Sequence, residues 1–264
     1  MSFNVAAEAY DAFMGRYSQG LSPQLADLAG IAPGLRVLDV GRGPGALVAE
    51  LVRRTGADHV SAVDPSVPFV RAVEARYPGV DARVGSAEAL PFDEGTFDAT
   101  LAQLVVHFMA DPVAGLAGMA RVTRVGGVVA ASVWDHASDQ GPLGLFWRAA
   151  RDLDPTIHDE SRLPGVREGH LAQLLEATGM LTDITHASQL VRVVHPTFED
   201  WWQPFTRGVG PAGAYVATLD DDHREALRSR CEALAGSGPI TITGRAWAAR
   251  GFRVDAAAAN LSHP

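Results

Sequence analysis

The chain has 264 residues, of which 47% are hydrophobic and 20% charged, a composition that excludes a disordered or fibrous protein. Its formal net charge of -9 argues against a broad nucleic-acid surface or an anionic-membrane binder. All 22 basic residues are arginine, which excludes P-loop lysine chemistry, Schiff-base lysines and the Tyr-x-x-x-Lys pair of short-chain dehydrogenases. The single cysteine, Cys231, excludes an intramolecular disulfide and a cysteine-rich metal site.

Targeting and membrane signals are not readable in the sequence. Residues 1–16 lack a basic start followed by an apolar run. The longest apolar stretch, 101–120, is interrupted by His107 and by the pair Asp111-Pro112. We therefore expect a soluble, cytoplasmic protein.

The first half of the chain alternates between strand and helix patterns. Residues up to 34 look helical in two pieces, and Pro33-Gly34 marks a turn. The patterns that follow predict strands at 36–40, 59–63, 80–84, 97–106 and 128–134, helices at 46–54, 67–77 and 112–123, and a turn at Gly126-Gly127. This alternation predicts an α/β fold with a doubly wound, mostly parallel sheet.

The second half is less regular. Its patterns predict helices at 145–153, 168–178 and 220–234, an aromatic-rich helix start at 198–205, a long strand or a bent pair at 181–194, and a final strand at 239–249. The tail after Arg253 is expected to be loosely held.

A glycine-rich loop, Asp39-Val40-Gly41-Arg42-Gly43-Pro44-Gly45, joins the first strand to the following helix. Glycines permit a tight turn and let a ligand approach bare backbone, and the helix start offers free N–H groups. The loop also fits the dinucleotide fingerprint G-x-G-x-x-A. By itself it is compatible with a nicotinamide dinucleotide, with another nucleoside cofactor, or with a purely structural turn.

Asp64 ends the second strand, 19 residues after Gly45. A carboxylate at this position can accept hydrogen bonds from both ribose hydroxyls of an adenosine. The alternative is a helix cap for the helix at 67–77, and the two roles are compatible.

A third segment, Gly85-Ser86-Ala87-Glu88-Ala89-Leu90-Pro91-Phe92, follows the third strand, and Phe97-Asp98 leads into the fourth, which ends near Gln103. Together with the glycine-rich loop and Asp64, this third segment makes residues 10–134 resemble the class I S-adenosylmethionine-dependent methyltransferases. Within that family they resemble the subgroup similar to ubiquinone/menaquinone-biosynthesis enzymes. The run 37–45 is similar to that family's first motif, Asp64-Pro65-Ser66 to its ribose motif, and Ala87–Phe92 to its adenine-side motif. Residues 121–127 resemble the turn before its fifth strand.

The resemblance implies a Rossmann-like, seven-stranded sheet whose last strand is antiparallel. It also implies the cofactor contacts. Gly41, Gly43 and Gly45 would face the methionine part, Asp64, Pro65 and Ser66 the ribose, Ser86, Ala87 and Glu88 the adenine, and Gln103 the neighbourhood of the sulfonium. Asp39, in the first motif, is also expected to contact the cofactor. Arg42 and Ser86 depart from the family pattern, which usually has a small residue or Cys and an Asp at these two positions.

The N-terminal segment of related proteins often folds over the cofactor. Arg16 could then pair with the methionine carboxylate through two parallel bonds, and the alternative is an exposed arginine on a helix. The expected organisation is a covering segment at 1–34, a cofactor-binding core at 35–135, the remaining sheet with inserted acceptor-side helices at 136–253, and a tail at 254–264.

Two histidines are candidates for a catalytic base, His107 at the end of the fourth strand and His136 after the fifth, although a lone histidine is often structural. Six aromatic side chains suit an apolar or aromatic small-molecule acceptor or ordinary packing: Trp134, Phe146, Trp147, Trp201, Trp202 and Phe205. No His, Asp or Glu spacing indicates a metal site.

The sequence thus predicts an S-adenosylmethionine-dependent methyltransferase, with O- or C-methylation favoured and no nucleic-acid or membrane partner. The alternatives are an NAD-dependent oxidoreductase, which the absence of lysine disfavours, and a non-catalytic module that binds S-adenosylmethionine.

Overall fold

A computed structural model of the protein describes residues 10–255, except for the side chain of Asp11. Within this range seven strands form one sheet in the order β3-β2-β1-β4-β5-β7-β6. The strands are β1 (Val37–Val40), β2 (Val60–Asp64), β3 (Asp81–Val84), β4 (Phe97–Gln103), β5 (Thr123–Trp134), β6 (Leu181–His195) and β7 (Ile240–Arg253). β7 pairs antiparallel with β5 and β6, while the pairs among β1 to β5 are parallel. The predicted doubly wound α/β fold with an antiparallel last strand is confirmed.

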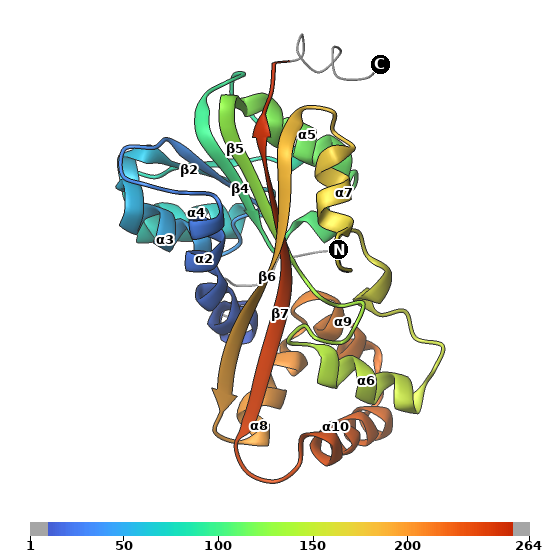
Figure 1. Ribbon diagram of the computed structural model, residues 1–264. Helices are drawn as coiled ribbons and strands as arrows, with labels where there is room; N and C mark the ends of the chain where they lie inside the picture. The colour runs from blue at the N-terminus through green and yellow to red at the C-terminus, as the bar shows by residue number, and fades with distance from the viewer. Residues whose placement is uncertain (1–9, 256–264) are drawn as a thin grey trace, which may run out of the picture.

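Helices cover both faces of this sheet, with α2, α3 and α4 on one side and α5 and α7 on the other (Figure 1). The helices are α2 (Arg16–Leu28), α3 (Ala46–Thr55), α4 (Val67–Arg76), α5 (Pro112–Val122), α6 (Gly144–Leu153), α7 (His170–Glu176), α8 (Phe198–Trp202), α9 (Gly210–Thr218) and α10 (Asp221–Ala235). A π-helical turn, η1 (Asp11–Gly15), precedes α2. Short 3₁₀ turns are η2 (Ala57–His59), η3 (Ala87–Ala89), η4 (Val106–Phe108), η5 (Glu160–Arg162) and η6 (Gln203–Arg207).

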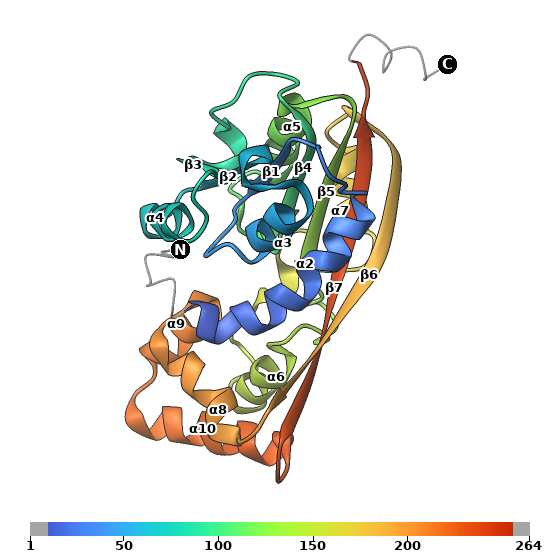
Figure 2. The ribbon, with the colours of Figure 1, turned by 90° about the vertical axis from the view of Figure 1, so that its left-hand side faces the viewer.

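The long strands β6 and β7 extend beyond the parallel part of the sheet and carry a second layer of helices, α6, α8, α9 and α10 (Figures 1 and 2). We refer to these four helices as the helical cap. Helix α2 crosses between the sheet and the cap in Figure 2. The cap has its own apolar core, which includes Phe146, Trp201 and Phe205 together with Phe13 and Tyr17 from the N-terminal helices. The parallel strands therefore end against the cap, and that boundary is where a ligand would be enclosed.

Most predicted elements of the first half agree with the structure within a few residues, but the turn predicted at Gly126-Gly127 lies inside β5. A Cβ on Gly127 would lie 2.6 Å from the Asp98 carbonyl oxygen, and the pairing of β4 with β5 shifts register between Phe97 and Ala99. The two glycines therefore allow close backbone approach at an irregularity of the sheet.

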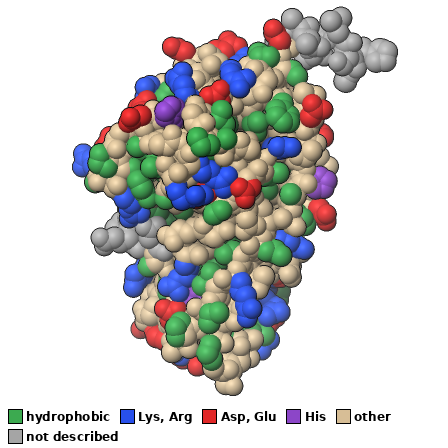
Figure 3. Space-filling model, turned by 60° about the vertical axis from the view of Figure 1, so that its left-hand side comes forward, with side chains coloured by type: hydrophobic (Ala, Val, Ile, Leu, Met, Phe, Trp, Pro, Cys, Tyr) green, Lys and Arg blue, Asp and Glu red, His purple; other side chains and the backbone are tan. Residues whose placement is uncertain are grey.

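None of the helices in residues 10–255 is long and apolar enough to cross a lipid bilayer. On the face shown in Figure 3, arginine and acidic side chains lie interspersed among hydrophobic ones. The first nine residues of the predicted covering segment and most of the predicted tail, 256–264, lie outside the described residues.

Candidate cofactor and acceptor site

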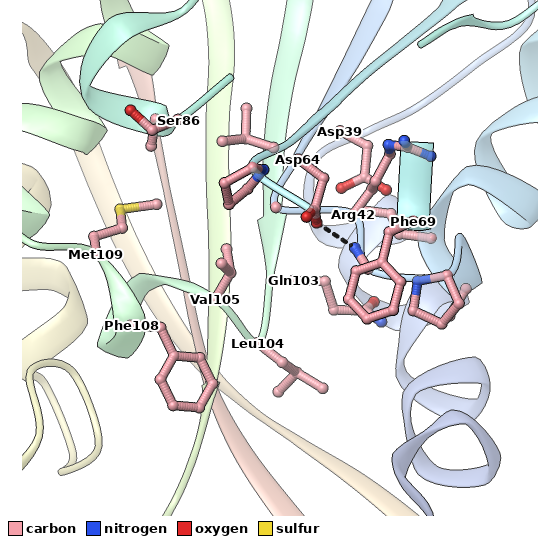
Figure 4. A pocket seen from close by; sticks show the side chains of 18 of the residues that line it. Asp39, Arg42, Asp64, Phe69, Ser86, Gln103, Leu104, Val105, Phe108 and Met109 are labelled. Atoms are coloured by element: carbon pink, nitrogen blue, oxygen red, sulfur yellow. Dashed lines mark hydrogen bonds between the residues drawn. The ribbon is translucent and has the colours of Figure 1, made fainter. Parts of the chain in front are cut away.

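A cavity of about 520 Å³ lies at the carboxyl ends of β1, β2 and β4 (Figure 4). This is where an open α/β sheet reverses its strand order, and ligands of such sheets bind at that position. Tyr10, Gly15 and Ser18 close the cavity from the side of η1 and α2. Ten residues predicted from the sequence line it: Asp39, Gly41, Gly43, Asp64, Pro65, Ser86, Ala87, Glu88, Gln103 and His107.

The glycine loop presents bare backbone to this cavity. Gly41 and Gly43 have φ angles of +69° and +52°, in the left-handed region that favours glycine. A Cβ on Gly41 would lie 2.4 Å from Cγ2 of Val105, whereas the nearest described atom to a Cβ on Gly43 would be Cε1 of Tyr10, at 3.9 Å. Gly41 is therefore required by packing, and Gly43 leaves free space in which a ligand fits.

Gly45 does not line the cavity. It precedes α3 with a φ of +100°, and a Cβ there would lie 2.8 Å from Cγ2 of Val73 on α4. Its role in the structure is to let α3 and α4 approach each other, so the predicted cofactor contact is not assigned to it.

Asp64 is buried and holds two backbone segments together. Its Oδ2 accepts a hydrogen bond from the Gly43 N–H at 2.9 Å, and its Oδ1 accepts one from the Ser66 N–H at 2.8 Å. Burial raises the pKa of this carboxyl group, and the two backbone donors oppose that effect. Ser66 immediately precedes α4, donates its N–H to Asp64, and does not line the cavity. Asp64 thus fixes the glycine loop against the second strand.

Asp39 and Arg42 are two buried ionisable residues beside Asp64 (Figure 4). Within the described residues, neither carboxylate oxygen of Asp39 and none of the three guanidinium nitrogens of Arg42 has a hydrogen-bond partner. Burial raises the pKa of Asp39 to about 8, with Arg42 opposing the shift. Burial likewise lowers the pKa of Arg42, with Asp64 and Asp39 opposing. Buried polar groups that lack hydrogen-bond partners, such as those of Asp39 and Arg42, are expected to bind a ligand or water.

Glu88 and Gln103 anchor neighbouring segments of the cavity wall. Oε1 of Glu88 accepts a hydrogen bond from the Ala110 N–H at 3.0 Å. Nε2 of Gln103 donates to the Ser18 carbonyl oxygen at 3.0 Å, which attaches the end of β4 to α2. Oε1 of Gln103 is buried with no hydrogen-bond partner in the described part of the chain, so an acceptor group faces the site.

Arg16 is not among the residues that line the cavity. Its Nη1 donates to Oδ2 of Asp200 at 2.9 Å and lies 3.1 Å from Nδ1 of His195. Nε2 of the same histidine lies 2.7 Å from the Tyr17 hydroxyl. The guanidinium therefore connects α2 to β6 and α8, and the predicted pairing with a cofactor carboxylate is withdrawn.

A second, smaller cavity of about 30 Å³ adjoins the first on the side of the cap. His107, Leu104, Phe108 and Tyr10 line both cavities. Leu104 turns the chain at the end of β4 with a φ of +60°, a strained conformation for a branched side chain that is often found at functional sites. The two cavities are thus separated by a shared wall rather than by a layer of core.

The second cavity is also lined by His136 and Glu160, which lie next to His107. Burial lowers the pKa of both imidazoles, that of His136 to about 4, so both are neutral at neutral pH. Burial raises the pKa of Glu160 to about 7, while a hydrogen bond from Trp147 opposes the shift. The predicted histidine pair is thus joined by a carboxyl group that was not predicted.

Most of the predicted aromatic wall belongs to the core of the cap. The rings of Phe146 and Phe205 are stacked at 4.6 Å, and those of Trp201 and Phe205 lie 4.8 Å apart. Trp134 is the member of the six that lines a cavity described here. Phe13, Met14 and Leu143 join it in an apolar lining of the smaller cavity.

Sequence reasoning placed Tyr10 in the covering segment without giving it a contact of its own, assigned no role to Leu104, and missed Glu160. The proximity of the two predicted histidines to each other follows from the strand pairing. Gln103 and Ser132 are paired across the parallel strands β4 and β5, and His107 and His136 each follow four residues after these positions. Equal offsets from paired positions of parallel strands predict proximity. Glu160 lies in an irregular segment and has no comparable signal.

Residues 38–131 match the family model described as a methyltransferase domain. An uncharacterized methyltransferase of Mycobacterium tuberculosis is 36% identical over 168 residues, which cover 62% of this chain and 65% of that protein. An uncharacterized protein of the same organism is 32% identical over 226 residues, 79% of this chain and 80% of its own length.

The fold has solved counterparts. The phosphoethanolamine N-methyltransferase 2 of Haemonchus contortus, solved with phosphomonomethylethanolamine and S-adenosylhomocysteine, aligns with a TM-score of 0.57 at 16% identity. The alignment covers 94% of this chain and 57% of that one. The chain thus contains a methyltransferase domain at residues 38–131, and its sheet has the fold of this solved methyltransferase.

Proposed function

We propose that the protein transfers a methyl group from S-adenosylmethionine to a small organic acceptor, by O- or C-methylation. The observation that carries this proposal is the pair of adjoining cavities. The larger one combines the glycine loop, Asp39 and Asp64 at the strand ends, and the smaller one is lined by apolar side chains together with Tyr10, His107, His136 and Glu160. The larger cavity has a volume that suits a nucleoside cofactor, and the smaller one, with room for only a few atoms, would receive only the reacting group of the acceptor.

The cofactor supplies an electrophilic methyl group on a positively charged sulfur, so the protein has to align the acceptor and exclude water. Asp39 would accept hydrogen bonds from the cofactor's ammonium group, since its oxygens are buried and lack partners among the described residues. Asp64 would receive the ribose hydroxyls on the remaining lone pairs of its carboxylate. Segment 1–34 would contribute cover through Tyr10, Gly15 and Ser18.

His107 and His136 lie on the acceptor side. O- or C-methylation of a hydroxyl or carbon acid requires that a proton be removed, and a neutral imidazole can accept a hydrogen bond from that proton, although the lowered pKa makes each ring a weaker base than a free histidine. We propose that these two side chains activate the acceptor. Because the rest of the smaller cavity is lined by side chains such as Phe13, Met14 and Leu143, the acceptor is expected to have an apolar portion.

S-adenosylhomocysteine is expected to raise the melting temperature of the protein, whereas NAD at the same concentration is not. At a concentration of about 100 times its dissociation constant, a ligand of the native state adds about 2.7 kcal/mol, which corresponds to roughly 5–10 °C for a protein of this size. The check is a thermal melt with each ligand. A shift with NAD alone would contradict the proposed cofactor.

Turnover is a separate question from binding. The protein should be incubated with isotopically methyl-labelled S-adenosylmethionine and a metabolite extract, followed by mass spectrometry for products that gain the labelled methyl group. A labelled product supports an enzyme. Binding of S-adenosylhomocysteine without any labelled product would favour the non-catalytic module.

Replacement of Asp64 by alanine is expected to lower both stability and cofactor affinity. It removes two hydrogen bonds to a charged acceptor, each worth about 1.5–3 kcal/mol, and frees the glycine loop. We expect S-adenosylhomocysteine affinity to fall roughly ten- to a thousandfold. Asp64→Asn should lower stability and cofactor affinity almost as much, because its amide oxygen can accept a hydrogen bond from only one of the two N–H donors while its NH₂ group faces the other.

Asp111→Ala is the matched control. Asp111 also accepts a backbone N–H, that of Ala114 at 3.0 Å, but it caps α5 and does not line the cavity. Its loss should cost about 0.5–2 kcal/mol of stability with cofactor affinity unchanged. Wild-type affinity in Asp64→Ala, measured by titration calorimetry, would remove Asp64 from the proposed site.

A further inference from the structure

Three metal-binding side chains converge beside the smaller cavity. His107 belongs to η4 after β4, His136 follows β5, and Glu160 begins η5. All three are buried, with 4–5% of each residue exposed. One donor atom from each lies within 4.8 Å of the other two. The parallel strands β4 and β5 bring the histidines together, and the loop after α6 adds the carboxylate.

One ring nitrogen on each histidine of this cluster lacks a hydrogen-bond partner. Nδ1 of His107 and Nε2 of His136 have none among the described residues. Oε1 of Glu160 lies 3.9 Å from Nε2 of His136, which is too far for a hydrogen bond. Oε2 of Glu160 accepts a hydrogen bond from Nε1 of Trp147 at 2.9 Å, so the orientation of the carboxylate is fixed. Such buried and unsatisfied groups call for an occupant.

The space beside the cluster is small. The cavity of about 30 Å³ that these three residues line has room for an ion and about one water molecule. It also borders the cofactor cavity through His107 and Leu104. An occupant would therefore lie next to the cofactor cavity, in the space where the reacting group of the acceptor is proposed to bind.

We propose that His107, His136 and Glu160 bind one divalent first-row transition-metal ion of the Zn²⁺ class. Two imidazoles and one carboxylate form a ligand set that such ions use when a coordination position stays open, whereas Mg²⁺ and Ca²⁺ prefer oxygen ligands. Donor atoms around a tetrahedral Zn²⁺ are about 3.4 Å apart, so side-chain shifts of less than about 1 Å close the site. The Trp147 hydrogen bond supplies the outer support that metal-ligating groups usually have.

The open position of the ion faces the smaller cavity, where an oxygen of the acceptor could bind. This step rests on the proposed methyl transfer, whereas the metal site itself does not. With an ion bound, the imidazole lone pairs serve as ligands, and the ion replaces the free imidazole base in activating the acceptor.

The test uses the full-length chain without a histidine tag, stripped with a chelator and dialysed. Titration with Zn²⁺ should reveal one ion per chain, and Co²⁺ should give the visible absorption of a four- or five-coordinate complex. His107→Gln, His136→Gln and Glu160→Gln each remove a ligand with little change in volume and should lower Zn²⁺ affinity at least about a hundredfold. Trp147→Phe should lower it about ten- to a hundredfold.

His186→Ala is the matched control, because His186 is exposed on β6 and away from the cluster. Its Zn²⁺ affinity should equal that of the wild type. Circular dichroism confirms folding of each variant, and S-adenosylhomocysteine binding is measured on the same samples. The metal proposal is overturned if the wild type binds no stoichiometric Zn²⁺, or if the three ligand variants bind it as tightly as the wild type. If the wild type binds Zn²⁺ but does not bind S-adenosylhomocysteine, the proposed function is refuted and the metal proposal stands.

Discussion

Replacement of Gly43 by valine is expected to abolish cofactor binding while the protein remains folded. Gly43 lines the larger cavity, and among the described residues a Cβ there would contact Tyr10 alone. A valine side chain would fill the volume that the cofactor needs. We expect S-adenosylhomocysteine affinity to fall at least about a thousandfold, which corresponds to about 4 kcal/mol.

Two controls separate the blocked space from backbone strain. Gly43→Ala imposes the same positive φ but adds one methyl group, so it should lose less affinity than the valine variant. Gly30→Val introduces valine at a similar φ of +67° in a turn with no atom within 4 Å of the added Cβ, away from the cavity. It should lose stability and keep its affinity. Calorimetric titration and melting curves of all three variants provide the check, and normal binding by Gly43→Val would place the cofactor elsewhere.

The glycine loop and its flanking elements were predictable because their signals are local. A short apolar run followed by glycines predicts a buried parallel strand, and β1 at Val37–Val40 lies within the predicted 36–40. The helix predicted at 46–54 is observed as Ala46–Thr55. Burial on both faces of the sheet and the backbone freedom of glycine leave these residues few alternatives.

The long strands of the second half were harder to predict. The segment predicted as one strand or a bent pair is a single strand, Leu181–His195. It stays continuous because β7 pairs with it along nearly its entire length, from Arg253 to Ile240. The final strand extends beyond its predicted end at residue 249 for the same reason. Pairing partners that lie about 60 residues away in the sequence leave no mark on the local pattern.

Side-chain partners distant in sequence account for the errors at the site. Arg16 was expected to bind a carboxylate, and it does bind one, that of Asp200, 184 residues away. Glu160 joins His107 and His136 only because an irregular loop returns to the ends of β4 and β5. Both contacts depend on how the cap packs on the sheet, which neither periodicity nor motif spacing reports.

Asp39→Asn is expected to weaken cofactor binding and to stabilise the empty protein increasingly as the pH rises from about 4 to about 8. Burial raises the pKa of Asp39 to about 8, compared with about 3.9 for an unfolded chain. Between these values the folded state binds one more proton than the unfolded state, so the free energy of unfolding falls as pH rises. Asparagine has no proton to lose, and the variant should lack this decline.

The size of the stability effect follows from the same shift. Each pH unit between the two pKa values costs about 1.4 kcal/mol, so by pH 8 the variant should exceed the wild type by up to about 5 kcal/mol. Near pH 4 the two should be almost equally stable. Denaturant unfolding at several pH values measures this difference. Asp81→Asn, on an exposed residue of β3, should leave the pH dependence of the wild type unchanged.

Although Asp39→Asn is expected to raise the stability of the empty protein, we expect it to lower the affinity for the cofactor. If the ionised carboxylate of Asp39 receives the cofactor's ammonium group, binding at pH 7 has to release about one proton from the wild type and none from Asp39→Asn. Calorimetry in buffers of different ionisation enthalpy measures that proton. The variant should also bind S-adenosylhomocysteine at least about tenfold more weakly, since a charge-assisted hydrogen bond is lost. Equal affinity and equal proton release in the two proteins would mean that Asp39 does not contact the ammonium group, because only direct pairing makes its ionisation depend on the ligand.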